Sequence, residues 1–537
     1  MAPRPRSSAG DSPRQSAQSA LNVEHDAHRD SSERGALLPR DRRAAPVPVG
    51  VAPNDDEVEA VVRKLNRRIL PIHFALALIC YLDRANLAFA ALQMNHDLGL
   101  SKADYGLGSG LFFVGYAAFQ LPSNIALSRV GAPAWLATIM CVWGVLATAM
   151  AGIRGIGSFL ALRLLLGAAE AGTFPGIWFH LSCCFPPEHV GEAYTKVATV
   201  TAVSAIVGGP VAAALMQLDG AWGLRGWQWL FLLEGLPCIV MAGVVFLGLP
   251  HSLGRTGFLS DGERRLLEGL IAARAARNSG REDEGAKREG LRAQLARVGA
   301  NAAVWHLGTV WGLAECTLYG VIFWMPLIIG DALGRDAAAD GGGGNAPTHH
   351  GVAGTGMVAV LSSIPFAAAS ISMLYVARRS VVKDERHRHT SYPLWAAAAC
   401  LIIFVPLGGV LGWGLLSFVA LTIAAGGVWA IHGPFMSWPG MVLHGSDKAL
   451  GIAVINSVGA IGGFVGPYLI GVLAHGRGDY SLAFAVLGVL LIASGALAWA
   501  FKEPPLLLDE GASGAGGSPA ESPHRLHPQM SAGGIDP

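Results

Sequence analysis

The sequence predicts an all-α membrane protein with twelve transmembrane helices in two six-helix, pseudo-symmetric bundles. Hydrophobic residues make up 52% of the 537 residues, and charged residues make up only 14%. Soluble domains carry about 25% charged residues. The apolar residues are also gathered into twelve separate runs. This pattern excludes a soluble enzyme, a disordered protein and a nucleic-acid-binding protein, and the formal net charge of +1 implies no polyanionic partner.

Each apolar run is close in length to one membrane crossing, which takes about 20 residues of helix for a core of about 30 Å. The run 393–435 is too long for one crossing, and Gly408, Gly409 and Gly412 allow it to fold into two. The predicted segments are 69–91, 105–128, 134–153, 157–180, 197–217, 228–249, 305–330, 352–377, 393–411, 414–435, 450–474 and 481–501.

The segments divide six and six around a polar central stretch. We expect an N-terminal bundle at 61–250, a central loop at 251–304 and a C-terminal bundle at 305–502. The tails 1–60 and 503–537 are expected to be disordered, because the first is rich in Pro, Ser, Arg and Asp and poor in apolar residues. The central loop contains a helix-start pattern, which indicates a surface helix, although a flexible linker is an equal alternative.

Basic residues gather on one side of the predicted membrane. Arg67 and Arg68 lie just before the first segment, and Arg378 and Arg379 follow the eighth. Loops on the other side carry few Lys and Arg. Under the positive-inside rule, both termini and the central loop are cytoplasmic. The sequence predicts a multi-pass integral membrane protein of the plasma membrane or an organellar membrane.

The two halves carry weak internal repeats. The fifth segment contains GGP at 208–210, and the eleventh, six segments later, contains GGFVGP at 462–467. Tandem six-helix halves are typical of carriers that rock about a central site. Glycine-rich helices in matching positions suit spans that must pack closely.

Four ionisable residues lie deep inside predicted spans. Asp83 and Arg84 are in the first span, and Arg163 and Glu170 are in the fourth. Charge in a membrane is expensive, so such residues indicate a functional site. Arg163 and Glu170 are seven residues apart, nearly two turns, which places them on one face about 10 Å apart. The four formal charges sum to zero.

This neutral set suggests a coupling mechanism. Protonation of Asp83 and Glu170 would leave the guanidinium groups of Arg84 and Arg163 uncompensated, and these would attract an anion. The planar guanidinium suits a carboxylate because it can hold both oxygens. Proton and anion binding would then assist each other reciprocally. The alternative is a static salt-bridge network that only neutralises buried charge.

Further residues are candidates on weaker grounds. Glu315 in the seventh span either adds a site in the C-terminal half or pairs with a nearby His or Trp, and Glu234 is interpreted as structural, near a helix start. Asn456 can hydrogen-bond a substrate, and Tyr81 and Tyr116 can line a pocket. The histidines His180 and His432 are interpreted as core residues with satisfied hydrogen bonds. The cysteines form no CxxC pair, so no disulfide framework, metal site or cofactor is expected.

Several long stretches in order resemble the major facilitator superfamily, and within it the anion:cation symporter branch of tartrate, phthalate, galactonate and hydroxyphenylacetate carriers. The resemblance covers most of 65–250 and 430–475. The matching stretches are YLDRANLAFAALQM (81–94), YGLGSGLFFVGYAAFQLPSNIALSRVG (105–131), RLLLGAAEAGTFPG (163–176), GWQWLFLLEGLP (226–237) and GIAVINSVGAIGGFVGPYLIG (451–471).

The resemblance implies roles for residues already selected. It associates Asp83 and Glu170 with proton coupling and Arg84 and Arg163 with binding of the substrate carboxylate. It also implies a substrate contact at Asn456. The two tyrosines, Tyr81 and Tyr116, match pocket positions. A monomer is the default state in this family.

The sequence therefore predicts a secondary active transporter that moves a small organic carboxylate with protons by alternating access. Its expected partners are the organic anion, protons and the lipid bilayer. A facilitative uniporter or exchanger without proton coupling, or a non-transporting sensor on the same fold, is the alternative. An enzyme is not expected, since the sequence lacks a G-x-S-x-G, an H-E-x-x-H and a P-loop motif.

Overall fold

The computed structural model describes residues 55–186, 188–251, 256–281, 291–339, 352–411, 414–443, 447–475 and 479–503. The chain divides into a compact unit that ends at Phe501 and a second unit that begins at Lys502. The predicted tails lie almost wholly outside the described residues. The exceptions are Glu503 and the end of the N-terminal tail, where a helix, α2 (Asp55–Arg68), begins inside the range predicted to be disordered.

Helices account for all the regular structure in the described residues, and the predicted fold class is confirmed. Eleven helices there are long and apolar enough to cross a membrane, or twelve if one bent pair is a single span. The bent pair, Val190–Ser204 and Ile206–Met216, meets at 44° and corresponds to the fifth predicted segment. The twelve predicted crossings therefore each have a counterpart.

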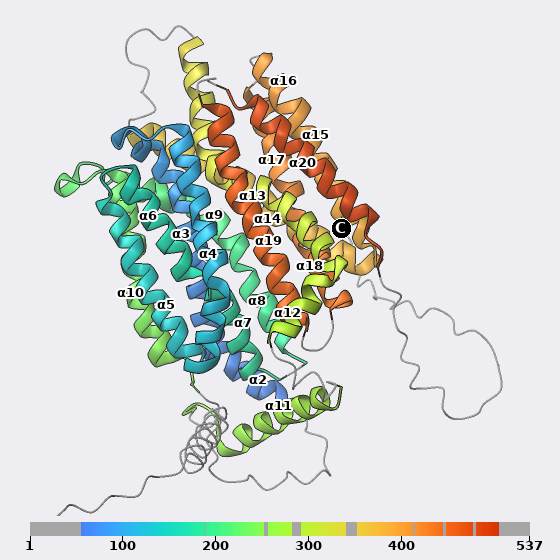
Figure 1. Ribbon diagram of the computed structural model, residues 1–537. Coiled ribbons are helices and arrows are strands. Elements are labelled where there is room, and N and C mark those ends of the chain that lie inside the picture. The colour runs from blue at the N-terminus through green and yellow to red at the C-terminus, as the bar shows by residue number, and fades with distance from the viewer. Residues whose placement is uncertain are drawn as a thin grey trace, which may run out of the picture. The chain divides into compact units, whose positions relative to one another are not determined.

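The first six crossings precede the polar central stretch (Figure 1). They are α3 (Leu70–Asp97), α4 (Lys102–Val130), α5 (Ala132–Ala149), α6 (Ile156–Glu170) with α7 (Thr173–Cys184), α8 (Val190–Ala198) with α9 (Val200–Met216), and α10 (Gly226–Gly248). Short 3-10 turns, Met150–Gly152 and Ala221–Gly223, extend the connections.

The second six crossings follow two connecting helices, α11 (Asp261–Arg281) and α12 (Leu291–Ala300). They are α13 (Ala302–Ala339), α14 (Val352–Lys383), α15 (Arg386–Ala399) with a π-helical stretch (Cys400–Phe404) and α16 (Val405–Val410), α17 (Gly414–Ala430) with α18 (His432–Val442), α19 (Asp447–Ala474), and α20 (Ser481–Ala500). Helix α11 is the surface helix that the helix-start pattern predicted.

Local sequence explains where the first crossings begin and end. Ser101 caps α4, because its hydroxyl accepts from the Asp104 amide at 3.1 Å and its own amide donates to the Asp104 carboxylate at 3.0 Å. Gly131 separates α4 from α5 with a φ of +88°, a conformation that favours glycine. Helix α5 then starts with Pro133 in its first turn, where a missing amide hydrogen is tolerated.

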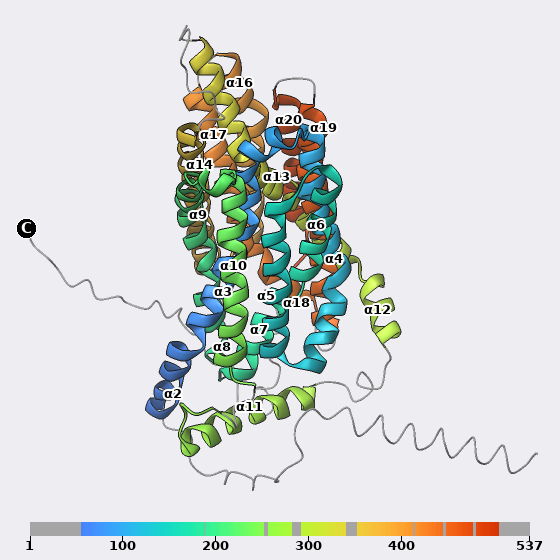
Figure 2. The same cartoon turned by 90° about the vertical axis from the view of Figure 1, so that its left-hand side faces the viewer.

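The connecting helix α11 lies at the end of the helices where α2 enters α3 (Figure 2). Lys64 on α2 bonds both carboxylate oxygens of Glu263 on α11, at 2.7 and 2.8 Å. We call this end the α11 end. Helix α3 runs away from it and α4 returns toward it, so the first turns of α4 lie at the opposite end.

The two halves contact each other closely at that opposite end. A Cβ added to Gly106 would lie 2.6 Å from the Pro467 carbonyl oxygen, and one added to Gly110 would lie 2.6 Å from the Phe464 carbonyl oxygen. Glycine therefore lets the backbones of α4 and α19 touch. Gly209 on α9 meets Ala359 on α14 in the same manner.

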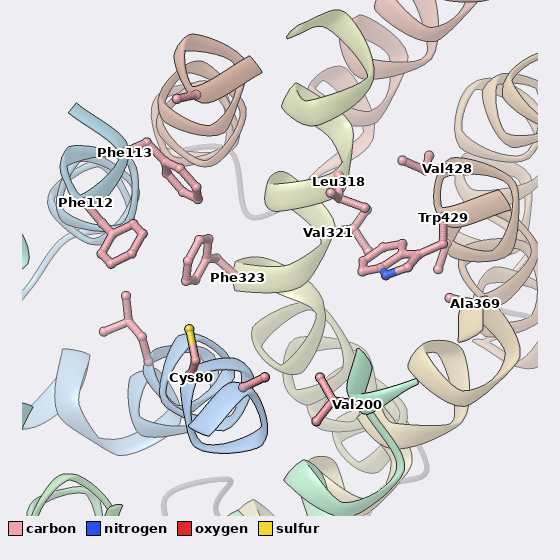
Figure 3. Packing of buried hydrophobic residues seen from close by; sticks show 14 of the residues in the cluster. Cys80, Phe112, Phe113, Val200, Leu318, Val321, Phe323, Ala369, Val428 and Trp429 are labelled. Atoms are coloured by element: carbon pink, nitrogen blue, oxygen red, sulfur yellow. The ribbon is translucent and has the colours of Figure 1, made fainter. Parts of the chain in front are cut away.

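Aromatic side chains continue this contact toward the centre. Phe113 on α4 lies 4.2 Å from Tyr319 and 6.3 Å from Phe323, measured between ring centroids, and both partners are on α13. Figure 3 shows Phe112, Phe113 and Phe323 gathered from the two halves, with Cys80 of α3 beside them. The interface between the halves is thus apolar next to the charged residues described below.

Candidate functional site

A buried ion pair joins the first crossing to the fourth. The Nε of Arg84 donates to Oε1 of Glu170 at 2.7 Å, and Nη2 lies 2.5 Å from the same oxygen. The Cys80 thiol, one turn before Arg84, also donates to Oε1 at 2.7 Å. The Glu170 side chain is fully buried, and its second oxygen, Oε2, has no hydrogen-bond partner among the described residues. One carboxylate oxygen therefore carries all of these interactions.

Aromatic rings surround the other faces of the Arg84 guanidinium. Its central carbon lies 5.6 Å from the Phe112 ring, 5.4 Å from the Tyr116 ring and 5.6 Å from the Phe174 ring. Tyr81 lies three residues before Arg84 on α3, and its ring centroid is 5.4 Å from that of Phe174. Cation–π contacts of this kind hold a guanidinium in place while leaving its outer N–H groups available.

Asp83 points in a different direction from its neighbour. Its Oδ2 accepts a hydrogen bond of 3.0 Å from the indole Nε1 of Trp143 on α5. Successive helix residues diverge by about 100°, so Asp83 and Arg84 serve different partners. The two adjacent charges therefore belong to separate contacts.

Arg163 is buried without a carboxylate at ion-pair distance among the described residues. Its Nε donates to the Gly108 carbonyl at 3.2 Å and its Nη2 to the Ser109 carbonyl at 3.4 Å. Its guanidinium lies 4.9 Å from the Phe112 ring. Asp83 attracts it electrostatically from a longer distance. The structure thus brings the four predicted charges into one region but pairs only Arg84 with Glu170.

The fourth crossing contains a two-residue turn at this site. Helix α6 ends at Glu170 and α7 begins at Thr173, and together they form one candidate span, Ile156–Cys184, which matches the predicted segment 157–180. At the turn, a Cβ added to Gly172 would overlap the Ser123 hydroxyl. Glu170 is therefore the last residue of α6, where it meets Arg84.

A family model for the Major Facilitator Superfamily matches residues 74–439. The chain belongs to the major facilitator superfamily. A putative tartrate transporter of Agrobacterium vitis is 36% identical over 447 residues, which covers 83% of this chain and 92% of that relative. A quinolone resistance transporter of Acinetobacter baumannii is 33% identical over 432 residues, covering 80% and 92%.

Solved structures agree on the fold. The xylose transporter XylE from E. coli, in a partially occluded inward open conformation, matches with a TM-score of 0.60 and 12% identity, covering 81% of this chain and 99% of that chain. The family and its relatives identify the protein as a membrane transporter of the major facilitator type and not an enzyme. Its resemblance to the organic-anion branch is confirmed by the relative named for tartrate.

Asn456 lies apart from the charged cluster of this major facilitator protein. It is partly exposed on α19, three residues before Gly459. No hydrogen bond within the described part of the chain involves its amide, and no described contact joins it to Arg84 or Glu170. Its predicted role as a substrate contact stays a prediction.

The structure corrects the placement of Glu234. This residue lies well inside α10 rather than near the start of a helix, and it is buried. Both of its carboxylate oxygens are enclosed, and neither has a hydrogen-bond partner in the part of the chain that the structure describes. Asp83 repels Glu234 electrostatically. Glu234 could be selected from the sequence as a carboxylate inside an apolar helix. Its surroundings could not be predicted, because the neighbouring residues come from other crossings.

Sequence reasoning selected Tyr116 but not Cys80, Trp143, Phe112 or Phe174. Cys80 lies four residues before Arg84 on α3, which places the two on the same helix face. That spacing could have identified Cys80. Within the described residues, no group of three or more His, Cys, Asp or Glu side chains could hold a metal ion.

Proposed function

We propose that this major facilitator protein carries a small organic carboxylate together with protons by alternating access. The Arg84–Glu170 ion pair is the observation that carries the proposal. A buried guanidinium is costly to leave unpaired, so it binds either the protein carboxylate or a substrate carboxylate. The relative named as a putative tartrate transporter supports a carboxylate substrate.

The coupling follows from competition for one cation. While Glu170 is ionised, it holds Arg84 through Oε1. A proton that adds to the Glu170 carboxylate removes its negative charge, and the Arg84 N–H groups then become free for a substrate carboxylate. Each event favours the other by the same factor. Proton and anion consequently travel together.

Asp83 and Arg163 supply a second proton-binding and anion-binding pair in this proposal. Arg163 is held by two carbonyl oxygens, which fix its position but do not neutralise its charge. Asp83 compensates that charge only from a distance. Protonation of Asp83 would therefore strengthen the attraction of Arg163 for an anion. Tyr81, Tyr116 and Asn456 are proposed to line the substrate site.

Alternating access requires that one end of the transporter be closed while the other opens. The backbone contacts of α4 with α19 and of α9 with α14 lie at the end opposite the α11 end. They support a state that is closed at this opposite end and accessible from the α11 end. The basic residues beside the first and eighth spans support a cytoplasmic α11 end and cytoplasmic termini. We further propose that the protein functions as a monomer.

Reconstituted liposomes test this function directly. An inward gradient of sugar acids, dicarboxylates or aromatic acids is imposed, and a lumenal dye reports pH. Wild-type protein is expected to acidify the lumen with at least one anion. Glu170→Gln is expected to abolish the acidification, whereas Glu192→Gln, at an exposed carboxylate on α8, should leave it unchanged. Uptake of labelled anion without acidification, unaffected by Glu170→Gln, would replace the proposal with a uniporter or exchanger.

A further inference from the structure

A second buried carboxylate lies in the C-terminal half. Glu315 on α13 is only 7% exposed. Within the described residues it makes no hydrogen bond and no ion pair. Its oxygens are not fully enclosed, in contrast to those of Glu234. A carboxylate in such a place is costly unless a partner reaches it, so a ligand is the natural source of that partner.

Aromatic residues stand on both sides of Glu315 along its helix. Trp311, one turn earlier, stacks on Phe435 with ring centroids 4.8 Å apart and an interplanar angle of 15°. Tyr319, one turn later, lies 4.2 Å from Phe113 of the N-terminal half. Across from Glu315 is Gly459 on α19, where an added Cβ would lie 3.6 Å from the Glu315 Cγ. Glu315 thus faces the interior between flat side chains.

A row of aromatic rings connects the helix of Glu315 to the cation of the other half. Tyr319, one turn from Glu315, lies 4.2 Å from Phe113, measured between ring centroids. The Phe113 ring lies 5.2 Å from the Phe112 ring, which in turn lies 5.6 Å from the Arg84 guanidinium. Arg84 also attracts the Glu315 carboxylate electrostatically, although the two do not form an ion pair. A cation on the N-terminal half and an anion on the C-terminal half are therefore connected by one group of aromatic rings.

We propose that Glu315 is a substrate-binding residue that receives a cationic nitrogen, and that the transported substrates are carboxylates carrying such a group. The substrate carboxylate binds Arg84, its protonated amine binds Glu315, and its central part packs against Tyr319 and Trp311. This inference rests on the proposed function, because it assigns the carboxylate to Arg84. A substrate of this kind would bridge the two halves and satisfy Glu315.

Matched pairs of carboxylates test this assignment in proteoliposomes. One pair is para-(aminomethyl)benzoate with para-ethylbenzoate, and a second is ε-aminocaproate with heptanoate. Saturable uptake of each compound is measured with wild-type protein, Glu315→Gln and Glu315→Asp. Elution and thermal unfolding of each purified variant establish that it is folded.

Wild-type protein is expected to take up the amine-bearing member of a pair with a KM about 10-fold lower, as one charge-assisted contact allows. Glu315→Gln should erase this preference, so that the KM values of the two members become equal, and Glu315→Asp should keep it. Equal uptake of both members by wild type, or a preference that survives Glu315→Gln, overturns the inference.

Two other results are distinguished by the same assay. If Glu315→Gln lowers the number of protons carried per substrate equally for both members, Glu315 is a proton carrier and the inference is wrong. If wild-type protein takes up no carboxylate, with or without an amine, the proposed function itself fails. Arg84→Ala serves as the reference, because it should remove uptake of both members.

Discussion

The guanidinium of Arg84 and the carboxylate of Glu170 form a buried ion pair with Nε and Oε1 2.7 Å apart. The pair connects α3 to the last residue of α6. Removing one partner of such a pair leaves an uncompensated charge, at a cost of about 3–5 kcal/mol. In the proposed mechanism, proton binding at Glu170 and anion binding at Arg84 would therefore compensate each other energetically.

Replacement of Arg84 by lysine separates charge from geometry. Lysine keeps the positive charge but has no planar pair of N–H donors for a carboxylate. We expect Arg84→Lys to raise the KM for the anion about 10-fold or more, since a charge-assisted hydrogen bond contributes about 1.5–3 kcal/mol. Uptake kinetics in liposomes measure this. Arg129→Lys, at an exposed position on α4, is the control. An unchanged KM in Arg84→Lys would show that the guanidinium does not bind the substrate.

The hydrogen bond from Trp143 to Asp83 is expected to contribute to stability. Trp143→Phe keeps an aromatic ring but removes the indole donor, which should lower the free energy of unfolding by about 1–3 kcal/mol. Thermal unfolding in detergent measures the loss. In Asp83→Asn the same tryptophan substitution should cost less, because the two groups act as a pair. The control is Trp135→Phe, since the Trp135 indole donates to Ser123 and not to Asp83. It should lower the free energy of unfolding equally in wild type and in Asp83→Asn. An equal loss in the two backgrounds for Trp143→Phe would contradict the prediction.

The sequence was sufficient to predict the crossings and the charged residues among them. Twelve apolar runs and four charges in them need only composition and length. The pairing was not predictable, because Arg163 bonds the carbonyl oxygens of Gly108 and Ser109 on a different helix. Trp143 was not selected, because a tryptophan inside an apolar run is normally interpreted as a residue that only packs in the core. The two-residue turn after Glu170 was not predictable, because Gly172 is one glycine among many in these helices.

An added methyl group at Gly106 should disfavour the contact between α4 and α19. A Cβ there would lie 2.6 Å from the Pro467 carbonyl oxygen, so Gly106→Ala must separate the two backbones. We expect the population to shift toward a state open at the end away from α11. Spin labels at Trp222→Cys and Leu415→Cys, one in each half, with Cys141 and Cys183 replaced by serine, report this as longer distances.

The matched control for Gly106→Ala is Gly243→Ala on α10, since no atom of the described residues lies within 4 Å of a Cβ added at that position. This control should leave the spin-label distances unchanged. A distance distribution for Gly106→Ala that matches wild type would show that the α4–α19 contact tolerates the methyl group, and would exclude it as a determinant of the closed state.

An ion pair at the same end gives a smaller, salt-sensitive effect. Lys102 on α4 lies 3.1 Å from Asp331 on α13, and the Tyr480 hydroxyl donates to the same carboxylate at 2.7 Å. A half-exposed ion pair contributes about 0.2–1 kcal/mol, so Asp331→Asn should shift the conformational ratio by no more than about fivefold. The same spin-label distances measure this. The exchanged pair Lys102→Asp with Asp331→Lys should restore part of the wild-type ratio, and a shift that is independent of salt would argue against an electrostatic cause.

Docking of α11 should weaken in acid. Hydrogen bonds from Lys64, and from the Ser260 amide, lower the pKa of Glu263 below its ordinary value. A carboxylate with a lowered folded-state pKa contributes stability above its unfolded value of about 4.3 and loses it as pH falls through the folded value. We therefore expect intact docking at neutral pH and faster amide exchange of α11 below about pH 4. Because the Lys64 side chain is 47% exposed, the Lys64–Glu263 ion pair contributes at most about 1 kcal/mol to docking.

Amide hydrogen exchange of α11, corrected for intrinsic rates, measures this docking. In Glu263→Gln, α11 should exchange faster at neutral pH and lose the acid dependence. The control Glu268→Gln, on the exposed face, should behave as wild type. Acid dependence that persists in Glu263→Gln would assign it to a different group.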